Sequence, residues 1–156
     1  MVQAVDIEAS VDRLVGVMAG ERGILLPLLH ALQEEFGHIP AHAVPIIAGA
    51  LNLSRAEVHG VLSFYHDFRA RPAARHVVKL CRAESCQARG GAAIEAALAE
   101  RLGVRMGGES VDGKVALEPI YCLGLCAIGP NALVDDRPMA RIDAAAVDRI
   151  AAEVTA

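Results

Sequence analysis

The chain has no tryptophan, only 3% aromatic residues and no surplus of positive charge. Fifteen lysines and arginines stand against 19 acidic residues, so the net charge is −4 and the basic surface typical of nucleic-acid binding is missing. Few aromatic rings also means little capacity to stack on bases. No apolar run approaches the roughly 20 residues that a membrane-spanning helix needs. These absences argue against a nucleic-acid partner and against a membrane span in this sequence.

The chain does contain enough apolar sequence for a folded core. Of its 156 residues, 54% are hydrophobic, and the mean hydropathy is +0.37. Intrinsic disorder requires the opposite combination, low hydrophobicity with high net charge. At about 100–200 residues per domain, this length predicts one domain or two small ones. Asp6 and Glu8 stand where a secretory leader carries basic residues, so we expect a cytoplasmic location.

Residues 5–70 have the apolar periodicity of four short helices. The fourth has the clearest start, because Ser54 precedes Glu57 by three residues and the two form a capping box; we expect this helix to continue to about Phe68. Short connections between four such helices predict a small antiparallel bundle. The expected helices cover residues 7–18, 25–36, 41–51 and 55–68.

The composition changes after a polar, proline-containing segment at residues 69–75. We place the domain boundary near residue 73, which gives a helical bundle over residues 1–72 and a second domain over residues 73–156. In the second domain Asp112 and Gly113 mark a hairpin-type turn, and Asp143 is positioned to cap a last helix. This mixture predicts an α/β layer. Strands are expected at residues 76–81, 115–121, 132–134 and 139–142, and helices at residues 94–102 and 144–154.

All four cysteines lie in the second domain, at positions 81, 86, 122 and 126. Cys81 ends a predicted strand, Cys86 falls in the loop before a helix, and the other two occupy the loop after another strand. Two loops at one end of a sheet can converge, and glycines there let backbone N–H groups turn toward thiolate sulfurs. The glycines placed for this are Gly90, Gly91, Gly124 and Gly129, and the cations that would raise a cluster's potential if they face it are Lys79, Arg82 and Arg89.

Several uses of four cysteines are open on spacing alone. Thiols stay reduced in the cytoplasm, which disfavours two disulfides. Structural zinc usually pairs its ligands about two to four residues apart, so gaps of four and three residues lie at or beyond that range. A thioredoxin-type C-x-x-C is absent, plant-type ferredoxin spacing matches only the first pair, and unliganded buried thiols remain a further alternative. The pattern favours one [2Fe–2S] cluster ligated by Cys81, Cys86, Cys122 and Cys126.

A family resemblance points the same way. The pattern C-x₄-C, thirty-five residues, then the run Cys122–Pro130 (CLGLCAIGP) resembles the thioredoxin-like [2Fe–2S] ferredoxin family, which includes the 24-kDa subunit of respiratory complex I. In the first half, residues 32–40, 53–61 and 63–65 resemble that family's helical bundle. The resemblance implies a helical bundle followed by a thioredoxin-like domain, and its four cluster ligands fall on the four cysteines.

Within the family, residues 59–69 and 79–87 are most similar to the gamma subunit of cytoplasmic, NAD-dependent, molybdenum-containing formate dehydrogenases. The resemblance implies docking on a subunit that binds FMN, NAD and a [4Fe–4S] cluster, in a complex with a larger molybdenum-containing subunit. The equivalent subunit of complex I or of a hydrogenase diaphorase is the alternative within the family. A zinc-stapled interaction module without redox activity is the alternative from another class.

Other residues suggest less chemistry. The sequence gives His30, His38, His42 and His76 no paired acid, and Gly107–Gly108 lacks the lysine of a phosphate loop. We therefore predict no catalytic residue and no nucleotide site in this chain. Three of its five aromatic residues, Phe64, Tyr65 and Phe68, fall within five positions. They pack between the two halves of the chain or form a docking surface for a partner.

Overall fold

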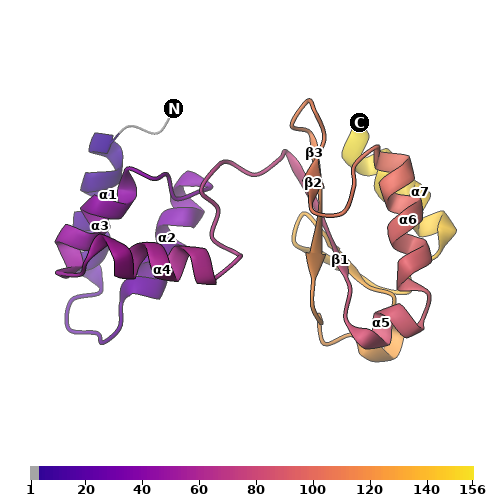
Figure 1. Ribbon diagram of the computed structural model, residues 1–156, viewed down its shortest axis with the longest axis horizontal. Coiled ribbons are helices and arrows are strands. Elements are labelled where there is room, and N and C mark those ends of the chain that lie inside the picture. The colour runs from indigo at the N-terminus through magenta and orange to yellow at the C-terminus, as the bar shows by residue number, and fades with distance from the viewer. Residues whose placement is uncertain (1–3) are drawn as a thin grey trace. The chain divides into compact units, whose positions relative to one another are not determined.

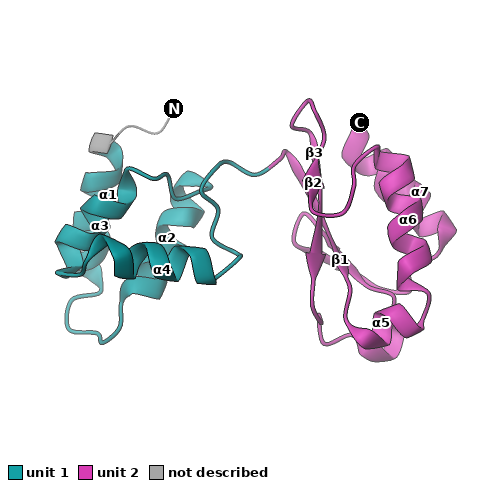
Figure 2. Ribbon diagram, viewed as in Figure 1, with its two compact units in different colours: residues 1–73 teal, residues 74–156 magenta. Residues whose placement is uncertain are grey.

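The structure is a computed structural model that describes residues 4–156, and it divides into two compact units, residues 1–73 and 74–156 (Figure 2). The first unit contains only helices, whereas the second combines a sheet with helices (Figure 1). Each unit has a hydrophobic core of its own. No helix in the described part of the chain is long and apolar enough to cross a membrane.

The first unit consists of α1 (Ala4–Val17), α2 (Leu25–Phe36), α3 (Ala43–Leu51) and α4 (Arg55–Phe64). Helix α1 packs against α2 and α3, and α3 packs against α4. The apolar stripes read from the sequence face inward, which confirms the four-helix prediction. The fully buried centre comprises Ile7, Val11, Leu28, Leu29, Ile47 and Val58.

The helix ends follow local rules that the sequence made visible. Helix α2 stops at Gly37, whose φ of 73° is left-handed, and α3 stops in the same way at Asn52. Helix α4 begins with the predicted capping box: the Ser54 side chain accepts from the Glu57 backbone N–H, and the Glu57 carboxylate accepts from the Ser54 backbone N–H at 2.8 Å.

Helix α4 ends at Phe64, so the expectation that it continues to about Phe68 is wrong. The side-chain amide of Gln33 fixes the segment after the helix in another conformation. It donates to the Asp67 carbonyl at 2.8 Å and accepts from the Arg69 N–H at 2.7 Å. These bonds require a side chain more than thirty residues away, which is why local periodicity overestimates the length of the helix.

The second unit is a five-stranded sheet in the order β2-β3-β1-β4-β5, with α6 and α7 on one side of it (Figure 1). The central strands β1 and β3 run parallel, and every other neighbouring pair is antiparallel. The strands are β1 (His76–Cys81), β2 (Gly108–Glu109), β3 (Val115–Ile120), β4 (Ala132–Val134) and β5 (Arg137–Met139). The helices are α5 (Glu84–Ala88), α6 (Gly91–Leu102) and α7 (Ala144–Thr155), with a 3₁₀ turn at Cys126–Ile128.

One face of this sheet forms the core with α6 and α7. Val78 of β1 pairs with Leu117 of β3 on one side and with Val134 of β4 on the other, and all three side chains are fully buried. Leu98 of α6 and Ile150 of α7 pack into the same cluster. Burying this row of side chains holds β1 and β3 in register, and the register determines where the two strands end.

Strand β5 covers residues 137–139, so the expectation of a strand at 139–142 is displaced. Asp135 and Asp136 have φ values of 49° and 61°, and they form a two-residue turn after which β5 begins at once. Such turns need two left-handed residues and usually contain glycine. Because glycine is absent here, the sequence carries no clear signal for so tight a hairpin.

Candidate metal centre

The four cysteines meet at one edge of the sheet because β1 and β3 are parallel. Cys81 is the last residue of β1 and pairs with Ile120, the last residue of β3; Cys122 follows two positions later. Strand β4 runs antiparallel to β1, so the segment that carries Cys126 approaches β4 at the same edge. The strand directions thus bring the two cysteine-bearing loops together, as predicted.

Cys86 lies on the short helix α5 rather than in an open loop, which corrects its expected position. It is 1% exposed, and Cys81 is 2% exposed, whereas Cys126 is half-buried and Cys122 is exposed. The φ of Cys122 is 71°, a left-handed conformation that costs a non-glycine residue energy and is common at functional sites. The four thiols therefore form a site with a buried side and a side open to solvent.

The sulfurs form two close pairs. The Sγ atoms of Cys122 and Cys126 are 3.6 Å apart, and the side chains of Cys81 and Cys86 are in hydrogen-bonding contact. A tetrahedral metal with metal–sulfur bonds of about 2.3 Å separates two of its sulfurs by about 3.8 Å. The Cys122–Cys126 pair is thus spaced to share one metal ion, and the contact between Cys81 and Cys86 makes them the second pair.

A single tetrahedral ion would require all four sulfurs at that separation. Within residues 4–156, no group of three or more histidine, cysteine or acidic side chains is arranged to hold one metal ion. A [2Fe–2S] cluster divides four thiolates between two irons, two to each. Two separate pairs of thiols therefore fit a two-iron cluster better than a mononuclear zinc site.

The surroundings of the cysteines shift the pKa values of their thiols in different directions. Burial raises the pKa of Cys81. Hydrogen bonds from the backbone N–H groups of Ala83, Cys122 and Leu123 and from the Cys86 side chain together outweigh burial, and the net pKa is lowered. Burial raises the pKa of Cys86, and the neighbouring Cys81 raises it further. The pKa of Cys126 is raised mainly by its contact with Cys122.

The expected role of the glycines is not seen at the Cys81 sulfur. The backbone donors at the Cys81 sulfur belong to Ala83, Cys122 and Leu123, not to glycines. Gly129 provides space instead: a Cβ added there would lie 3.2 Å from Cys86 Sγ, tighter than an ordinary contact.

Two of the three candidate cations are engaged elsewhere. Lys79 is bonded to Asp136 at 3.0 Å and Arg82 to Glu95 at 3.0 Å. Arg89 lies beside the cysteine-bearing loop, since its Cδ is 3.3 Å from the Cβ position of Gly129. Arg89 is therefore the candidate cation that the structure places next to the site.

The histidines show one correction. His76 does have an acidic partner, because its Nδ1 lies 2.7 Å from a carboxylate oxygen of Asp135 across the β1–β4 region. His30 packs its ring against Phe68, with centroids 4.9 Å apart. His76 begins β1 and so lies at the opposite end of that strand from Cys81.

The aromatic cluster separates into buried and exposed members. Phe68 is 9% exposed and belongs to the core of the first unit. Phe64 is 72% exposed and Tyr65 42% exposed, next to an apolar hollow on α4 that includes Leu25 and Val61. The candidate docking surface is therefore Phe64 and Tyr65, without Phe68.

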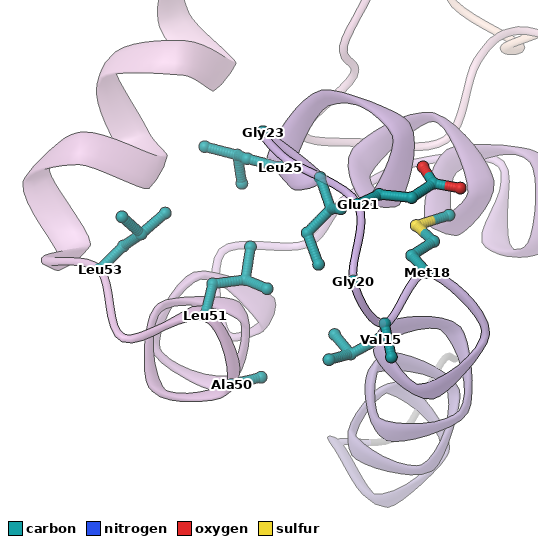
Figure 3. Close-up of a pocket in the computed structure, with 11 residues that line it drawn as sticks. Val15, Met18, Gly20, Glu21, Gly23, Leu25, Ala50, Leu51 and Leu53 are labelled. Carbon is teal, nitrogen blue, oxygen red and sulfur yellow. The ribbon is translucent and has the colours of Figure 1, made fainter.

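A second hollow in the first unit has a volume of about 430 Å³ (Figure 3). Its walls are apolar apart from Glu21, whose carboxylate Figure 3 shows turned away from Leu51 and Leu53. A single acidic group turned away from the cavity provides neither a metal site nor an acid–base pair. The hollow is suited to an apolar side chain.

Asn131, a polar residue buried among the cysteines, is a member of the site that the sequence patterns do not identify. Its Nδ2 lies 2.8 Å from the Leu125 carbonyl and 3.7 Å from Cys86 Sγ. The only local signal is an asparagine between Pro130 and a strongly apolar strand. No ligand-spacing rule includes such a position.

The sequence is similar to those of known proteins. The thioredoxin-like [2Fe–2S] ferredoxin family matches it over residues 11–155. One subunit of the NADH-quinone oxidoreductase of Escherichia coli (strain K12) is 32% identical over 129 residues, which is 83% of this chain and 78% of the relative. The HndA subunit of the NADP-reducing hydrogenase of Solidesulfovibrio fructosivorans is 28% identical over 133 residues. The match covers 85% of this chain and 78% of that subunit.

A solved structure agrees with these relatives. One chain in the crystal structure of the NAD⁺-reducing [NiFe]-hydrogenase in the air-oxidized state superposes with a TM-score of 0.73 at 28% identity. The match covers 85% of this chain but only 23% of that one, so this chain corresponds to a part of it. The expected architecture, a helical bundle followed by an α/β ferredoxin domain, is confirmed. This chain belongs to the thioredoxin-like [2Fe–2S] ferredoxin family.

Proposed function

We propose that the chain is the electron-transfer subunit of an NAD(H)-dependent oxidoreductase, and that Cys81, Cys86, Cys122 and Cys126 hold its one [2Fe–2S] cluster. The observation that carries the proposal is the arrangement of the four thiols as two close pairs at one edge of the sheet. Family membership supports the same cofactor.

When bound, a [2Fe–2S] cluster supplies the capacity to accept and release one electron. The chain's own residues control access to it. Cys81 and Cys86 keep one side dry, while the exposed Cys122 leaves the other side open to a redox partner. Backbone N–H groups directed at the Cys81 sulfur stabilise negative charge there. No substrate needs to bind this chain, and we assign it no catalytic residue.

The partner we propose is a flavoprotein subunit that binds FMN, NAD and a [4Fe–4S] cluster. The relatives are named as subunits of NADH-quinone oxidoreductase and of an NADP-reducing hydrogenase, both of which handle a nicotinamide cofactor. The first unit would dock through Phe64 and Tyr65, because exposed aromatic rings beside an apolar hollow are typical of interfaces. We propose that the assembly works in the cytoplasm.

The finer proposal is the gamma subunit of an NAD-dependent, molybdenum-containing formate dehydrogenase. Its support is the similarity of residues 59–69 and 79–87 to that subunit. A place in complex I or in a hydrogenase diaphorase is the second candidate, and the names of the relatives favour it. The cysteine site would be the same in each of these assemblies.

Anaerobic purification of the full chain tests the cluster. We expect a brown protein with two irons and two sulfides per chain and an electron paramagnetic resonance signal after dithionite. Cys122→Ala should lose that signal, while Ser63→Ala, in the other unit, should keep it. A colourless protein with stoichiometric zinc would instead make the thiolates structural and remove electron transfer from the proposal.

Isolation of the native assembly tests the finer proposal. The chain would be tagged in its own host and the complex purified with its partners. Molybdenum in the complex and formate-dependent reduction of NAD⁺ would support the formate dehydrogenase. Hydrogen-dependent NAD(P)⁺ reduction, or NADH-dependent quinone reduction without molybdenum, would assign the chain to the second candidate.

A further inference from the structure

Asn131 occupies an unusual position for an amide side chain. It lies between Pro130 and strand β4 and is 1% exposed. Among the described residues, only Asn131 and Ser10, which lies in the first unit, are both polar and buried. Buried amides destabilise a protein unless their hydrogen bonds are made, so a specific arrangement must hold this one.

Asn131 touches each segment that carries a cysteine. Its backbone carbonyl accepts from the Cys81 N–H at 2.9 Å. Its Nδ2 donates to the carbonyl of Leu125, the residue before Cys126, at 2.8 Å. The same nitrogen lies 3.7 Å from the Cys86 sulfur on α5. One residue thus connects β1, α5 and the Cys122–Cys126 loop.

The chemistry of the neighbours determines which way the amide faces. The atom next to the Leu125 carbonyl oxygen must be a donor, so it is Nδ2, and its second hydrogen is free for the Cys86 sulfur. The opposite atom, Oδ1, is buried with no hydrogen-bond partner among the described residues. Burying an acceptor without a partner costs stability. The contribution of this side chain therefore comes from the two contacts of Nδ2.

We infer that Asn131 is a positioning residue of the proposed cluster site: it ties the Cys122–Cys126 loop to α5 and donates a hydrogen bond to the Cys86 sulfur. The inference rests on the proposed function. A hydrogen bond to a ligating sulfur favours the reduced, more negative state and so raises the reduction potential. The backbone N–H of Asn131 also donates to this sulfur and is kept in every side-chain variant. Loss of the side-chain donor alone should therefore lower the potential and loosen the loop.

The experiment compares Asn131→Leu, which has a similar shape and no donor, with Asn131→Ala, which relieves any strain that leucine introduces. Gln87→Leu is the matched control. It removes another amide next to the same cysteine on α5, whose Nε2 is buried and has no hydrogen-bond partner within residues 4–156. Iron content, the electron paramagnetic resonance spectrum and the reduction potential are measured on the full chain, purified anaerobically.

We expect the Asn131 variants to bind less iron than wild type. At a fixed potential, the ratio of reduced to oxidised cluster should fall at least threefold, which is about 28 mV for one electron. Gln87→Leu should match wild type in both readouts. Asn131 variants with wild-type iron content and potential would overturn the inference and leave the proposed function standing. A wild-type protein without iron would overturn the proposed function itself, and the inference with it.

Discussion

Space around Cys86 is limited at Gly129. This glycine has a φ of −69° and a ψ of 165°, which alanine adopts without strain, so only the contact of a new methyl group matters. That methyl would lie 3.2 Å from the Cys86 sulfur and 3.3 Å from Arg89 Cδ. A substitution at Gly129 therefore changes the space beside the Cys86 sulfur without straining the backbone.

Gly129→Ala should lower the iron content and reduce the free energy of unfolding by about 1–3 kcal/mol, as overpacking does. Metal analysis and urea unfolding followed by circular dichroism measure the two effects. The control is Gly60→Ala in α4, where an added Cβ meets nothing within 4 Å and should raise stability by about 0.5–1 kcal/mol. Unchanged iron in Gly129→Ala would show that the loop moves freely away from Cys86.

Asp135 provides a pH-dependent contribution to stability. Burial alone would raise its pKa, but hydrogen bonds from His76 and from the Val77 backbone N–H outweigh it and hold the pKa below the ordinary 3.8. A carboxyl whose pKa falls on folding stabilises the folded state above its unfolded pKa, and that stabilisation disappears as the pH drops through the folded value. Its contribution is therefore complete near neutral pH.

Asp135→Asn tests this, because asparagine tolerates the same left-handed backbone. At pH 7 the variant should be less stable than wild type by about 0.5–1 kcal/mol, a modest amount because the pair is partly exposed. The difference should shrink as the pH falls below about 4. Urea unfolding at both pH values measures it, and a difference that stays constant down to about pH 2.5 would contradict the prediction.

At the scale of elements, α4 is the helix with the strongest start signal. Its capping box satisfies two backbone N–H groups, those of Ser54 and Glu57. Ser54→Ala should cost about 1 kcal/mol, which corresponds to about fivefold faster amide hydrogen exchange within α4. Ser63→Ala, near the other end of the helix, removes a bond to the Gly60 carbonyl and should change exchange far less. Equal effects of the two substitutions would show that the cap contributes nothing specific.

The elements also show where sequence reasoning reaches its limit. Starts and stops that depend on neighbouring residues, such as Gly37 and the Asp143 cap of α7, could be read directly. The end of α4 could not, because Gln33 determines it from another helix. The short helix α5 around Cys86 was missed, since five residues carry too little periodicity to identify.

For the site, the positions of the cysteines relative to the predicted strands indicated that the four would come together at one end of the sheet, and they do. Their role as cluster ligands remains a prediction. The side chains that contact those cysteines, or pair with the cations near them, could not be predicted from the spacing. Asn131 reaches Cys86 across 45 positions, and the ion pairs of Lys79 and Arg82 depend on the packing of β1 against its neighbours. Such contacts are properties of the folded sheet.

For the whole molecule, the proposed function assigns a different task to each of the two units. The second unit contains the cysteines, and the first contains the exposed aromatic surface of Phe64 and Tyr65 beside its own closed core. Changes to that surface should therefore affect assembly and leave the cluster intact. Changes to the core of the first unit should affect its folding.

Phe64→Ala and Phe68→Ala distinguish these effects within one short segment. Phe64 is 72% exposed, so its loss should change stability by less than about 0.5 kcal/mol yet weaken binding to the flavoprotein subunit tenfold or more, as truncation of an interface aromatic does. Phe68 is 9% exposed and packs on His30, so its loss should cost about 3–5 kcal/mol of stability. Titration of each purified variant with the purified flavoprotein subunit, alongside urea unfolding, provides both numbers. Wild-type affinity in Phe64→Ala would exclude Phe64, the most exposed aromatic ring among the described residues of the first unit, from the docking surface.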